Sequence, residues 1–202
     1  MTESVPVRIG VLALQGGVRE HAAILEGLGA EVTLVRRAEQ LPGIDALVLP
    51  GGESSAIDRL LRVLGLRDPL RAALADGLPA LGTCAGMILL AREILDAAPG
   101  QESLGALDVA VRRNAYGRQI ASAEDVVSTP DGPRTVAFIR APRVERVGPD
   151  VSVIARRDAA VVGVRSGSVT ALTFHPELSG VTAWHQELVD QAHHRAAGTS
   201  RP

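Results

Sequence analysis

Short apolar runs alternate with amphipathic stretches along the first half of the chain, which indicates strands that alternate with helices. The runs expected to form strands are residues 7–14, 31–37, 45–52 and 78–86. In the other stretches, apolar residues recur every three or four positions, as on one face of a helix, over residues 18–29, 54–65, 68–77 and 86–95. Most of the strand runs are continuously apolar, which is typical of strands buried on both faces. This half therefore predicts a mostly parallel sheet with helices on both faces.

The second half carries shorter apolar runs broken by Pro and Gly, which predict strands in an antiparallel meander. These runs are residues 107–117, 135–142, 151–157, 159–167 and 169–177. A last amphipathic helix is expected over residues 181–198, before a polar end. We therefore expect one α/β domain over residues 1–197, to which the second half adds antiparallel strands, and a disordered tail at residues 198–202.

Composition excludes several classes of function. Of the 202 residues, 46% are apolar and 2% aromatic, which suits a single core of Ala, Val, Leu and Ile. The net charge of −2 comes without a concentrated run of either sign, so we expect neither a nucleic acid nor a membrane surface as a partner. The longest uncharged stretch, residues 77–91, is shorter than the roughly 20 apolar residues of a membrane span. One cysteine and no basic-then-apolar leader predict a cytoplasmic protein.

All 21 basic residues are Arg, which excludes every function that needs a lysine in this chain. A P-loop, a Schiff base to a sugar or to pyridoxal phosphate, and a Ser-Lys dyad all depend on that side chain. Any imine chemistry in which this protein takes part must therefore be done by another chain.

The only cysteine, Cys84, lies in the motif Gly-Thr-Cys-Ala-Gly between an expected strand and an expected helix. Gly-x-nucleophile-x-Gly at such a junction is the pattern of a nucleophile elbow, a sharp turn that needs small residues on both sides. At a helix N-terminus the dipole and the free N–H groups favour the thiolate, and these N–H groups can also bind an oxyanion. An inert cysteine buried in a Gly-rich turn fits the same five residues.

A second motif, Phe-His-Pro-Glu at residues 174–177, ends the last apolar run. Pro176 disfavours helical backbone at His175, and in an extended segment residues two apart point to the same side, so His175 and Glu177 can touch. A carboxylate beside an imidazole fixes its tautomer and stabilises its protonated form, as a general base for a thiol requires. A lone His at a strand end is more often a surface residue, so this interpretation depends on Cys84.

A third motif, Pro-Gly-Gly-Glu-Ser-Ser at residues 50–55, follows another expected strand. Ordinary turn and cap chemistry explains it, but paired glycines also let backbone N–H groups approach a substrate or an oxyanion. Leu-Gln-Gly-Gly at residues 14–17 occupies a similar place after the first strand. In doubly wound sheets ligands lie at the carboxyl ends of strands, where both motifs and Cys84 are expected.

Two arginines, Arg113 and Arg140, are candidates for binding a substrate carboxylate, because a guanidinium presents two parallel donors to it. The histidines other than His175 are expected on solvated helix faces: His21, His185, His193 and His194. Because the sequence lacks ligand spacings such as His-Glu-x-x-His, no metal site is predicted.

Together these motifs resemble those of class I glutamine amidotransferases, and among them the glutaminase subunits of pyridoxal 5′-phosphate synthase. The resemblance extends over nearly the whole chain, in the order GVLALQGGVREH, LVLPGGESSAIDRL, GTCAGMILLA, RRNAYGRQ, FIRAP and TFHPEL. Departures are small: Gly17 stands where Ala is common, and Ser55 and Ala56 stand where Thr is frequent. The resemblance implies a flavodoxin-like three-layer α/β sandwich.

The resemblance also implies hydrolysis of glutamine to glutamate and ammonia by a triad of Cys84 as nucleophile, His175 as base and Glu177 orienting His175. It implies that glutamine lies against Gly52, Glu53, Ser54, Arg113, Ile139 and Arg140. The oxyanion would bind backbone N–H groups of Gly52 and Ala85, and no cofactor is implied. The implied partners are L-glutamine and a separate synthase subunit, with up to twelve synthase and twelve glutaminase chains in the assembly and low activity for this chain alone.

Two other interpretations stay open at this point. A flavodoxin-like cysteine peptidase or deglycase relative also carries its cysteine on such a turn, although its base usually comes from another part of the chain. A non-catalytic α/β binding module would contain an inert Cys84, which would alkylate slowly and without protection by glutamine.

Overall fold

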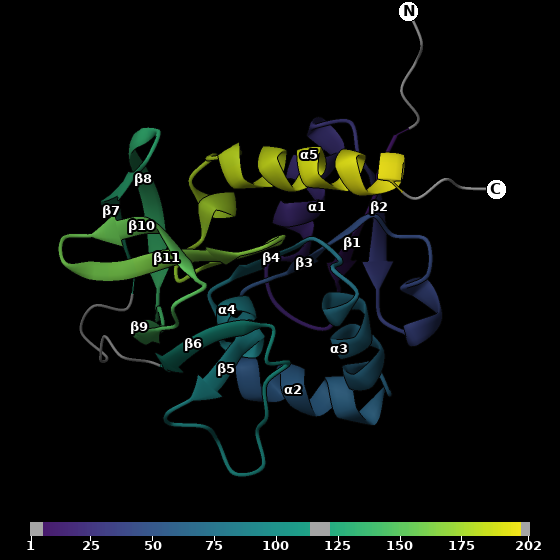
Figure 1. The fold of residues 1–202 in the computed structure, drawn as a ribbon, viewed down its shortest axis with the longest axis horizontal. Helices are drawn as coiled ribbons and strands as arrows, with labels where there is room; N and C mark the ends of the chain where they lie inside the picture. The colour runs from purple at the N-terminus through teal and green to yellow at the C-terminus, as the bar shows by residue number, and fades with distance from the viewer. Residues whose placement is uncertain (1–5, 114–121, 199–202) are drawn as a thin grey trace, which may run out of the picture.

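The structure, a computed structural model, describes residues 6–113 and 122–198. Within these residues a nine-stranded sheet runs through the molecule in the order β2-β1-β3-β4-β12-β11-β10-β7-β8 (Figure 1). In this spatial order the strands are β2 (Glu31–Val35), β1 (Arg8–Leu12), β3 (Ala46–Leu49), β4 (Ala80–Thr83), β12 (Val169–Leu172), β11 (Ala160–Ser166), β10 (Ser152–Arg157), β7 (Ser122–Thr129) and β8 (Gly132–Ile139).

The direction of the strands changes along this sheet. The strands from β2 to β12 pair in parallel, whereas the pairs from β12 to β8 are antiparallel. The predicted division into a parallel first half and an antiparallel addition is confirmed, with one refinement. Although β12 belongs to the second half, it pairs in parallel with β4, and Leu172 stands opposite Thr83. The carboxyl ends of β4 and β12 therefore lie side by side.

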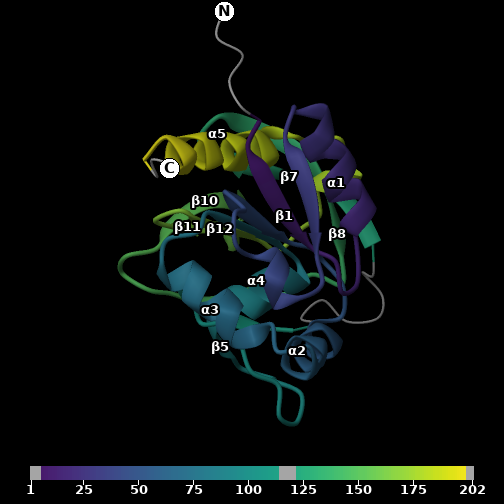
Figure 2. The same ribbon diagram turned by 90° about the vertical axis from the view of Figure 1, so that its right-hand side faces the viewer.

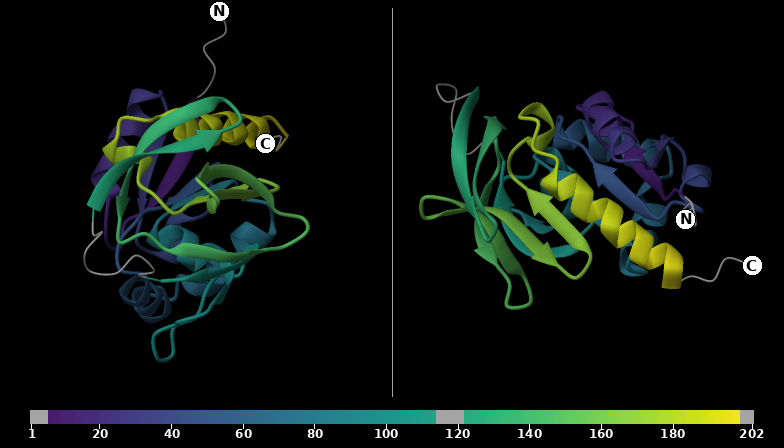
Figure 3. Two further views of the ribbon diagram at one scale, coloured as in Figure 1. Left: turned by 90° about the vertical axis from the view of Figure 1, so that its left-hand side faces the viewer. Right: turned by 90° about the horizontal axis from the view of Figure 1, so that it is seen from above.

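Helices cover both faces of the sheet, as predicted (Figure 2). One face carries α1 (Val18–Gly27) and α5 (Ala183–Gly198), and the other carries α2 (Ser54–Val63), α3 (Arg67–Ala75) and α4 (Ala85–Leu90). Alternate residues of β3 point into two different cores: Val48 packs in the core under α1 and α5, and Leu49 in the core under α2, α3 and α4. Burial on both faces explains the continuously apolar runs. From above, α5 crosses the sheet diagonally (Figure 3).

The helix expected over residues 86–95 is wrong in its second half. The helix α4 ends at Leu90, and Ala91–Ile94 forms strand β5, which pairs in parallel with β6 (Leu107–Arg112) and, through it, with β9 (Arg143–Val147) in a three-stranded sheet. The N–H of Leu104 donates to the carbonyl oxygen of Leu89, an acceptor that a longer helix would use itself. Tertiary pairing has overridden the local helical pattern here.

Two strands escaped prediction because their sequences look polar. Strands β7 and β9 contain charged residues at alternate or successive positions, and β9 has no fully buried residue. The expected strand over residues 107–117 is present as β6 up to Arg112. Residues 114–117 of that prediction lie outside the described residues. Of the tail expected to be disordered, residues 199–202 also lie outside them, and Gly198 is the last residue of helix α5.

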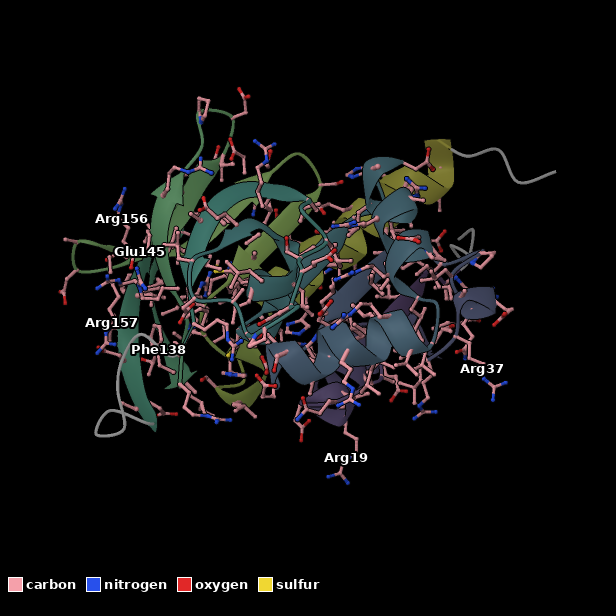
Figure 4. The ribbon with its side chains drawn as sticks, turned by 90° about the horizontal axis from the view of Figure 1, so that it is seen from below. Arg19, Arg37, Phe138, Glu145, Arg156 and Arg157 are labelled. Atoms are coloured by element: carbon pink, nitrogen blue, oxygen red, sulfur yellow. The ribbon has the colours of Figure 1, made fainter. Side chains whose placement is uncertain are left out.

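Three of the few aromatic residues form a row beneath the end of β12. The ring centroids of Phe138 and Phe174 lie 5.6 Å apart and those of Phe174 and Trp184 lie 5.1 Å apart, both in edge-to-face geometry. The guanidinium of Arg157 covers the outer ring, 5.0 Å from the centroid of Phe138 (Figure 4). Because Phe138 and Phe174 directly precede Ile139 and His175, this row anchors two segments that carry candidate site residues.

Charged side chains lie mostly outside these cores. Arg19 and Arg37, for example, extend away from the body of the molecule (Figure 4). Among residues 6–113 and 122–198, the structure contains no helix with the length and apolar character needed to cross a membrane.

Candidate active site

Cys84 sits on a sharp turn between β4 and α4. Its backbone has φ 50° and ψ −103°, a left-handed conformation that costs an L-residue about 1–3 kcal/mol. The flanking glycines are needed for close packing: a Cβ on Gly82 would stand 2.6 Å from Leu90 Cδ1, and one on Gly86 only 2.0 Å from the carbonyl oxygen of Leu49. The turn therefore has the strained, tightly packed geometry predicted for a nucleophile elbow.

The parallel pairing of β4 with β12 brings His175 to this turn. The backbone N–H of Cys84 donates to the carbonyl oxygen of Leu172, 2.8 Å away, and the N–H of His175 donates to that of Ala137, also at 2.8 Å. The imidazole of His175 lines the same cavity as the thiol of Cys84, and its interaction with Cys84 raises the pKa of His175. Cys84 Sγ also lies 3.7 Å from the carbonyl oxygen of Ile139. The thiol and the imidazole, 91 positions apart in the sequence, thus meet at the carboxyl ends of adjacent strands.

Glu177 supports the imidazole from behind. Its Oε1 lies 2.7 Å from Nδ1 of His175, and only 1% of its side chain is exposed. The sequence predicted this contact from an extended backbone, but Pro176–Leu178 forms a 3₁₀ turn. Because this turn folds back on His175, it brings the carboxylate beside the ring by a different route from the one expected.

Burial and hydrogen bonding act in opposite directions on this pair. Burial alone lowers the pKa of His175, but hydrogen bonds to Cys84 and Glu177 outweigh it and raise the pKa to about 10. Burial alone raises the pKa of Glu177, but the hydrogen bond to His175 and the nearby imidazole of His21, whose Nε2 lies 3.5 Å from Oε2, lower it to about 2. At neutral pH the pair is an imidazolium beside a carboxylate, and the imidazolium faces the sulfur.

A cavity of about 350 Å³ opens above the sulfur. It is lined by the predicted residues Gly52, Glu53, Ser54, Cys84, Arg113, Ile139, Arg140, His175 and Glu177, together with Gly16, Gly17, Glu20, Gly51, Ile88 and Leu178. Of the predicted site residues, only Ala85 is absent from the lining, because it is fully buried as the first residue of α4. Its backbone N–H precedes the first intrahelical bond, which Ile88 N makes to Cys84 O.

Glu53 and Arg113 form the charged wall of this cavity. The Glu53 carboxylate caps α2 by accepting from the N–H groups of Ser55 and Ala56, and Arg113 Nη2 lies 3.4 Å from its Oε1. Burial raises the pKa of Glu53, but the hydrogen bond from the Ser55 hydroxyl, then those from the two backbone N–H groups and the charge of Arg113, lower it below its usual value. The carboxylate is therefore a fixed negative charge at the rim of the cavity.

Gln101, which the sequence did not single out, connects two of the predicted residues. Its Nε2 donates to Ser54 Oγ at 3.0 Å, and its Oε1 accepts a short hydrogen bond from Arg113. Gln101 is buried in the loop between β5 and β6, and its Oε1 also accepts from the N–H of Ala98 at 3.1 Å. Nothing in the local sequence marks it, because its importance comes from residues 47 and 12 positions away. Of the motif RRNAYGRQ, residues 114–119 lie outside the described residues.

The expectation that four histidines lie on solvated helix faces is half wrong. His193 and His194 are exposed, but His21 and His185 have no exposed surface. The helical spacing contained the signal: His21 falls in the apolar stripe of α1 between Val18 and Leu25. Within the described part of the chain, no group of three or more His, Cys, Asp or Glu side chains is arranged to hold a metal ion.

Comparisons with known proteins identify the family of this chain. The SNO glutamine amidotransferase family model matches residues 11–193. A protein of Kineococcus radiotolerans named pyridoxal 5′-phosphate synthase subunit PdxT is 52% identical, covering 98% of this chain and all of the relative. A protein of the same name from Acidothermus cellulolyticus is 56% identical, covering 90% of this chain and 92% of the relative.

Solved structures agree on the fold. The crystal structure of a glutamine amidotransferase superposes with a TM-score of 0.86 at 45% identity, covering 91% of this chain and 98% of that one. The structure of PurLQS from Thermotoga maritima covers 98% of this chain and all of its own, with a TM-score of 0.64 at 19% identity, and at that identity the likeness concerns the fold alone. The expected flavodoxin-like α/β architecture is confirmed.

Proposed function

The chain belongs to the SNO glutamine amidotransferase family and is thus a glutamine amidotransferase, and from this premise we propose that it is the glutaminase subunit of a pyridoxal 5′-phosphate synthase. The observation that carries the proposal is that Cys84, His175 and Glu177 line one cavity, with Oε1 of Glu177 2.7 Å from Nδ1 of His175. Positive Arg113 and Arg140 and negative Glu53 line the same cavity, and opposite charges at its rim suit a free amino acid.

In the first half of the reaction, the Cys84 thiolate attacks the side-chain carbonyl carbon of glutamine. The electrons of the carbonyl double bond move to the oxygen, and backbone N–H groups of Gly52 and Ala85 bind this oxyanion. When the tetrahedral intermediate collapses, the carbon–nitrogen bond breaks and His175 gives its proton to the departing nitrogen. The products of this half are ammonia and a γ-glutamyl thioester on Cys84.

In the second half, His175, now neutral, takes a proton from a water molecule that attacks the thioester carbonyl. The carbon–sulfur bond breaks, glutamate leaves, and the thiolate and imidazolium are restored. Throughout, Glu177 holds the Nδ1 proton of His175, so that the other ring nitrogen faces the reaction. Glu53, Ser54, Arg113, Ile139 and Arg140 bind and position the glutamine.

We further propose that the ammonia passes to a separate synthase subunit, in an assembly of up to twelve chains of each kind. The relatives named above are called subunits of pyridoxal 5′-phosphate synthase, which supports such a partner. The absence of lysine supports it too, because forming a pyridine ring from sugar phosphates needs an imine-forming amine that this chain does not have.

The test mixes this chain with the synthase subunit encoded in the same genome and measures glutamate and ammonia released from glutamine. We expect little release by either chain alone, release by the mixture, and none with Cys84→Ala. Turnover by the Cys84→Ala mixture would refute the assigned nucleophile. Release of amino acids from peptides, without hydrolysis of glutamine, would instead favour a cysteine peptidase.

A further inference from the structure

One oxygen of Glu177 has no assigned role in this mechanism. Oε1 binds His175, but Oε2 is buried and makes no hydrogen bond to any described residue. A buried carboxylate oxygen that lacks a donor is costly, because it has lost its water without replacement. A candidate donor is Nε2 of His21, which lies 3.5 Å from Oε2.

His21 is itself held from two sides in the interior. Its Nδ1 lies 2.8 Å from Nε2 of His185, on α5, and its Nε2 lies 3.1 Å from Oγ1 of Thr83. Thr83 Oγ1 also accepts from the N–H of Gly51 at 3.1 Å, in the loop that lines the cavity. Both imidazoles are fully buried, so packing leaves the ring of His21 little freedom to turn away from Glu177.

The hydrogen-bond partners of His21 and His185 favour one position for the proton of His21. Burial, and next the charge of the neighbouring imidazole, lower the pKa of His185 to about 3, so His185 is neutral. If its proton is on Nε2, it donates to Nδ1 of His21, whose own proton is then on Nε2. A proton on Nδ1 of His185 would instead be a buried donor without an acceptor, because this atom has no hydrogen-bond partner among the described residues. The first arrangement is therefore favoured, and in it an N–H of His21 points at Thr83 and Glu177.

We propose that His21 is a positioning residue for glutamine hydrolysis: its Nε2–H, braced by His185, holds Oε2 of Glu177 so that Oε1 stays on His175. This inference rests on the proposed function, in which Glu177 orients His175. The proposal adds His21 and His185 to the series of side chains formed by Cys84, His175 and Glu177. It also explains why two histidines are buried where α1 and α5 face the sheet.

The matched pair His21→Gln and His21→Asn tests this role. The amide nitrogen of Gln stands near the Nε2 position of the imidazole and keeps a donor toward Glu177, whereas that of Asn stands near the Nδ1 position and keeps only the contact with His185. With the synthase subunit present, we expect His21→Asn to lower kcat about 10- to 100-fold, the cost of a misplaced reacting group, with an unchanged KM for glutamine. We expect His21→Gln to stay within a few-fold of wild type, and exposed His194→Gln to match wild type.

Equal kcat values for His21→Gln and His21→Asn would overturn the proposal. The double variant gives a second check. The proposal would also be overturned if His21→Asn lowered kcat by the same factor in the Glu177→Gln background as in the wild type, because a residue that acts through Glu177 should have little effect once that carboxylate is gone. If His21→Asn does not fold, His185→Leu and His185→Gln replace the pair. Only the former removes the donor that braces His21, so only the former should lower kcat, and equal values again overturn the proposal.

A second measurement separates this inference from the proposed function. The rate at which iodoacetamide alkylates Cys84 reports on the state of the triad without requiring glutamine or a partner. Slower alkylation in His21→Asn than in His21→Gln supports the positioning role even if the wild type hydrolyses no glutamine. Absence of glutamine hydrolysis by the wild type would contradict only the proposed function. Equal alkylation rates in the two variants, together with normal turnover by the wild type, would contradict only the positioning role.

Discussion

The imidazole of His175 lies directly against the backbone of Gly51: a Cβ added to Gly51 would stand 2.3 Å from Cε1 and 3.1 Å from Nδ1 of the ring. Real Cβ atoms essentially never come so close to another heavy atom, so a side chain at this position must displace the ring. The first Gly of the Pro-Gly-Gly motif thus defines one side of the slot that holds the base, and the second lines the cavity.

We therefore predict that Gly51→Ala moves His175 off the line between Cys84 and Glu177. The expected result is a fall in kcat of about 10- to 100-fold, since small misplacements of a reacting group cost that much. The measurement is glutamine hydrolysis in the presence of the synthase subunit. Gly27→Ala is the matched control, because a Cβ there meets no atom within 4 Å, and it should keep wild-type kcat. Wild-type kcat for Gly51→Ala would contradict this account of the slot.

A second prediction concerns Gln101 and the binding of glutamine. Gln101→Leu removes the hydrogen bonds to Ser54 and Arg113, so both side chains lose their orientation in the cavity wall. A hydrogen bond to a charged group contributes about 1.5 kcal/mol, so we expect the KM for glutamine to rise about tenfold while kcat changes little. Exposed Gln186→Leu on α5 should leave both constants unchanged. A fall in kcat without a rise in KM would show that Gln101 acts elsewhere.

A third prediction concerns pH and the pairing of His175 with Glu177. The pKa of Glu177 is lowered from 4.5 to about 2, so its contribution to stability is present above pH 4.5 and is lost as the pH falls through 2. The pKa of His175 is raised from 6.5 to about 10, so its contribution is full below pH 6.5 and is lost as the pH rises through 10.

Urea unfolding of wild type and Glu177→Gln over this pH range checks the prediction. The free energy of unfolding should differ most between pH 4.5 and 6.5, where both groups are charged in the folded state and the contribution of each is complete. The difference should shrink toward pH 2 and toward pH 10. A difference that is constant with pH would mean that Glu177 stabilises the fold by packing rather than by its charge.

A fourth prediction isolates the backbone strain at the elbow from the chemistry of the thiol. Both Cys84→Gly and Cys84→Ala lack the nucleophile, but only Gly adopts φ 50° without strain. We expect Cys84→Gly to unfold with a free energy about 0.5–1 kcal/mol higher than Cys84→Ala, because relief of strain exceeds the extra entropy of the unfolded chain. At Ala85, the first helical residue, the substitution Ala85→Gly should instead lower the free energy of unfolding. Equal stabilities of the two Cys84 variants would show that the turn stores no strain.

Local patterns were sufficient for most of the strands and helices of the first half. Strands buried on both faces, such as β3, are continuously apolar, and helices such as α2 show one apolar stripe, so residues 45–52 and 54–65 could be assigned without knowing their neighbours. The pattern failed at Ala91–Ile94, where pairing with β6 outweighs helix propensity, and at β7 and β9, whose polar residues give no clear period.

The candidate site divides in the same way. Cys84, His175, Glu177 and the residues around Gly52 stand in motifs of a few neighbouring residues whose types already indicate their chemistry, so the sequence by itself determined the reaction class and predicted the reacting groups. His21, His185 and Gln101 carry no such local mark. Their roles arise where α1 meets α5 and where a loop closes on α2, between residues as many as 164 positions apart. Only the tertiary structure could decide them, because a hydrogen bond depends on distance and direction in space, and neither is written in the order of the residues.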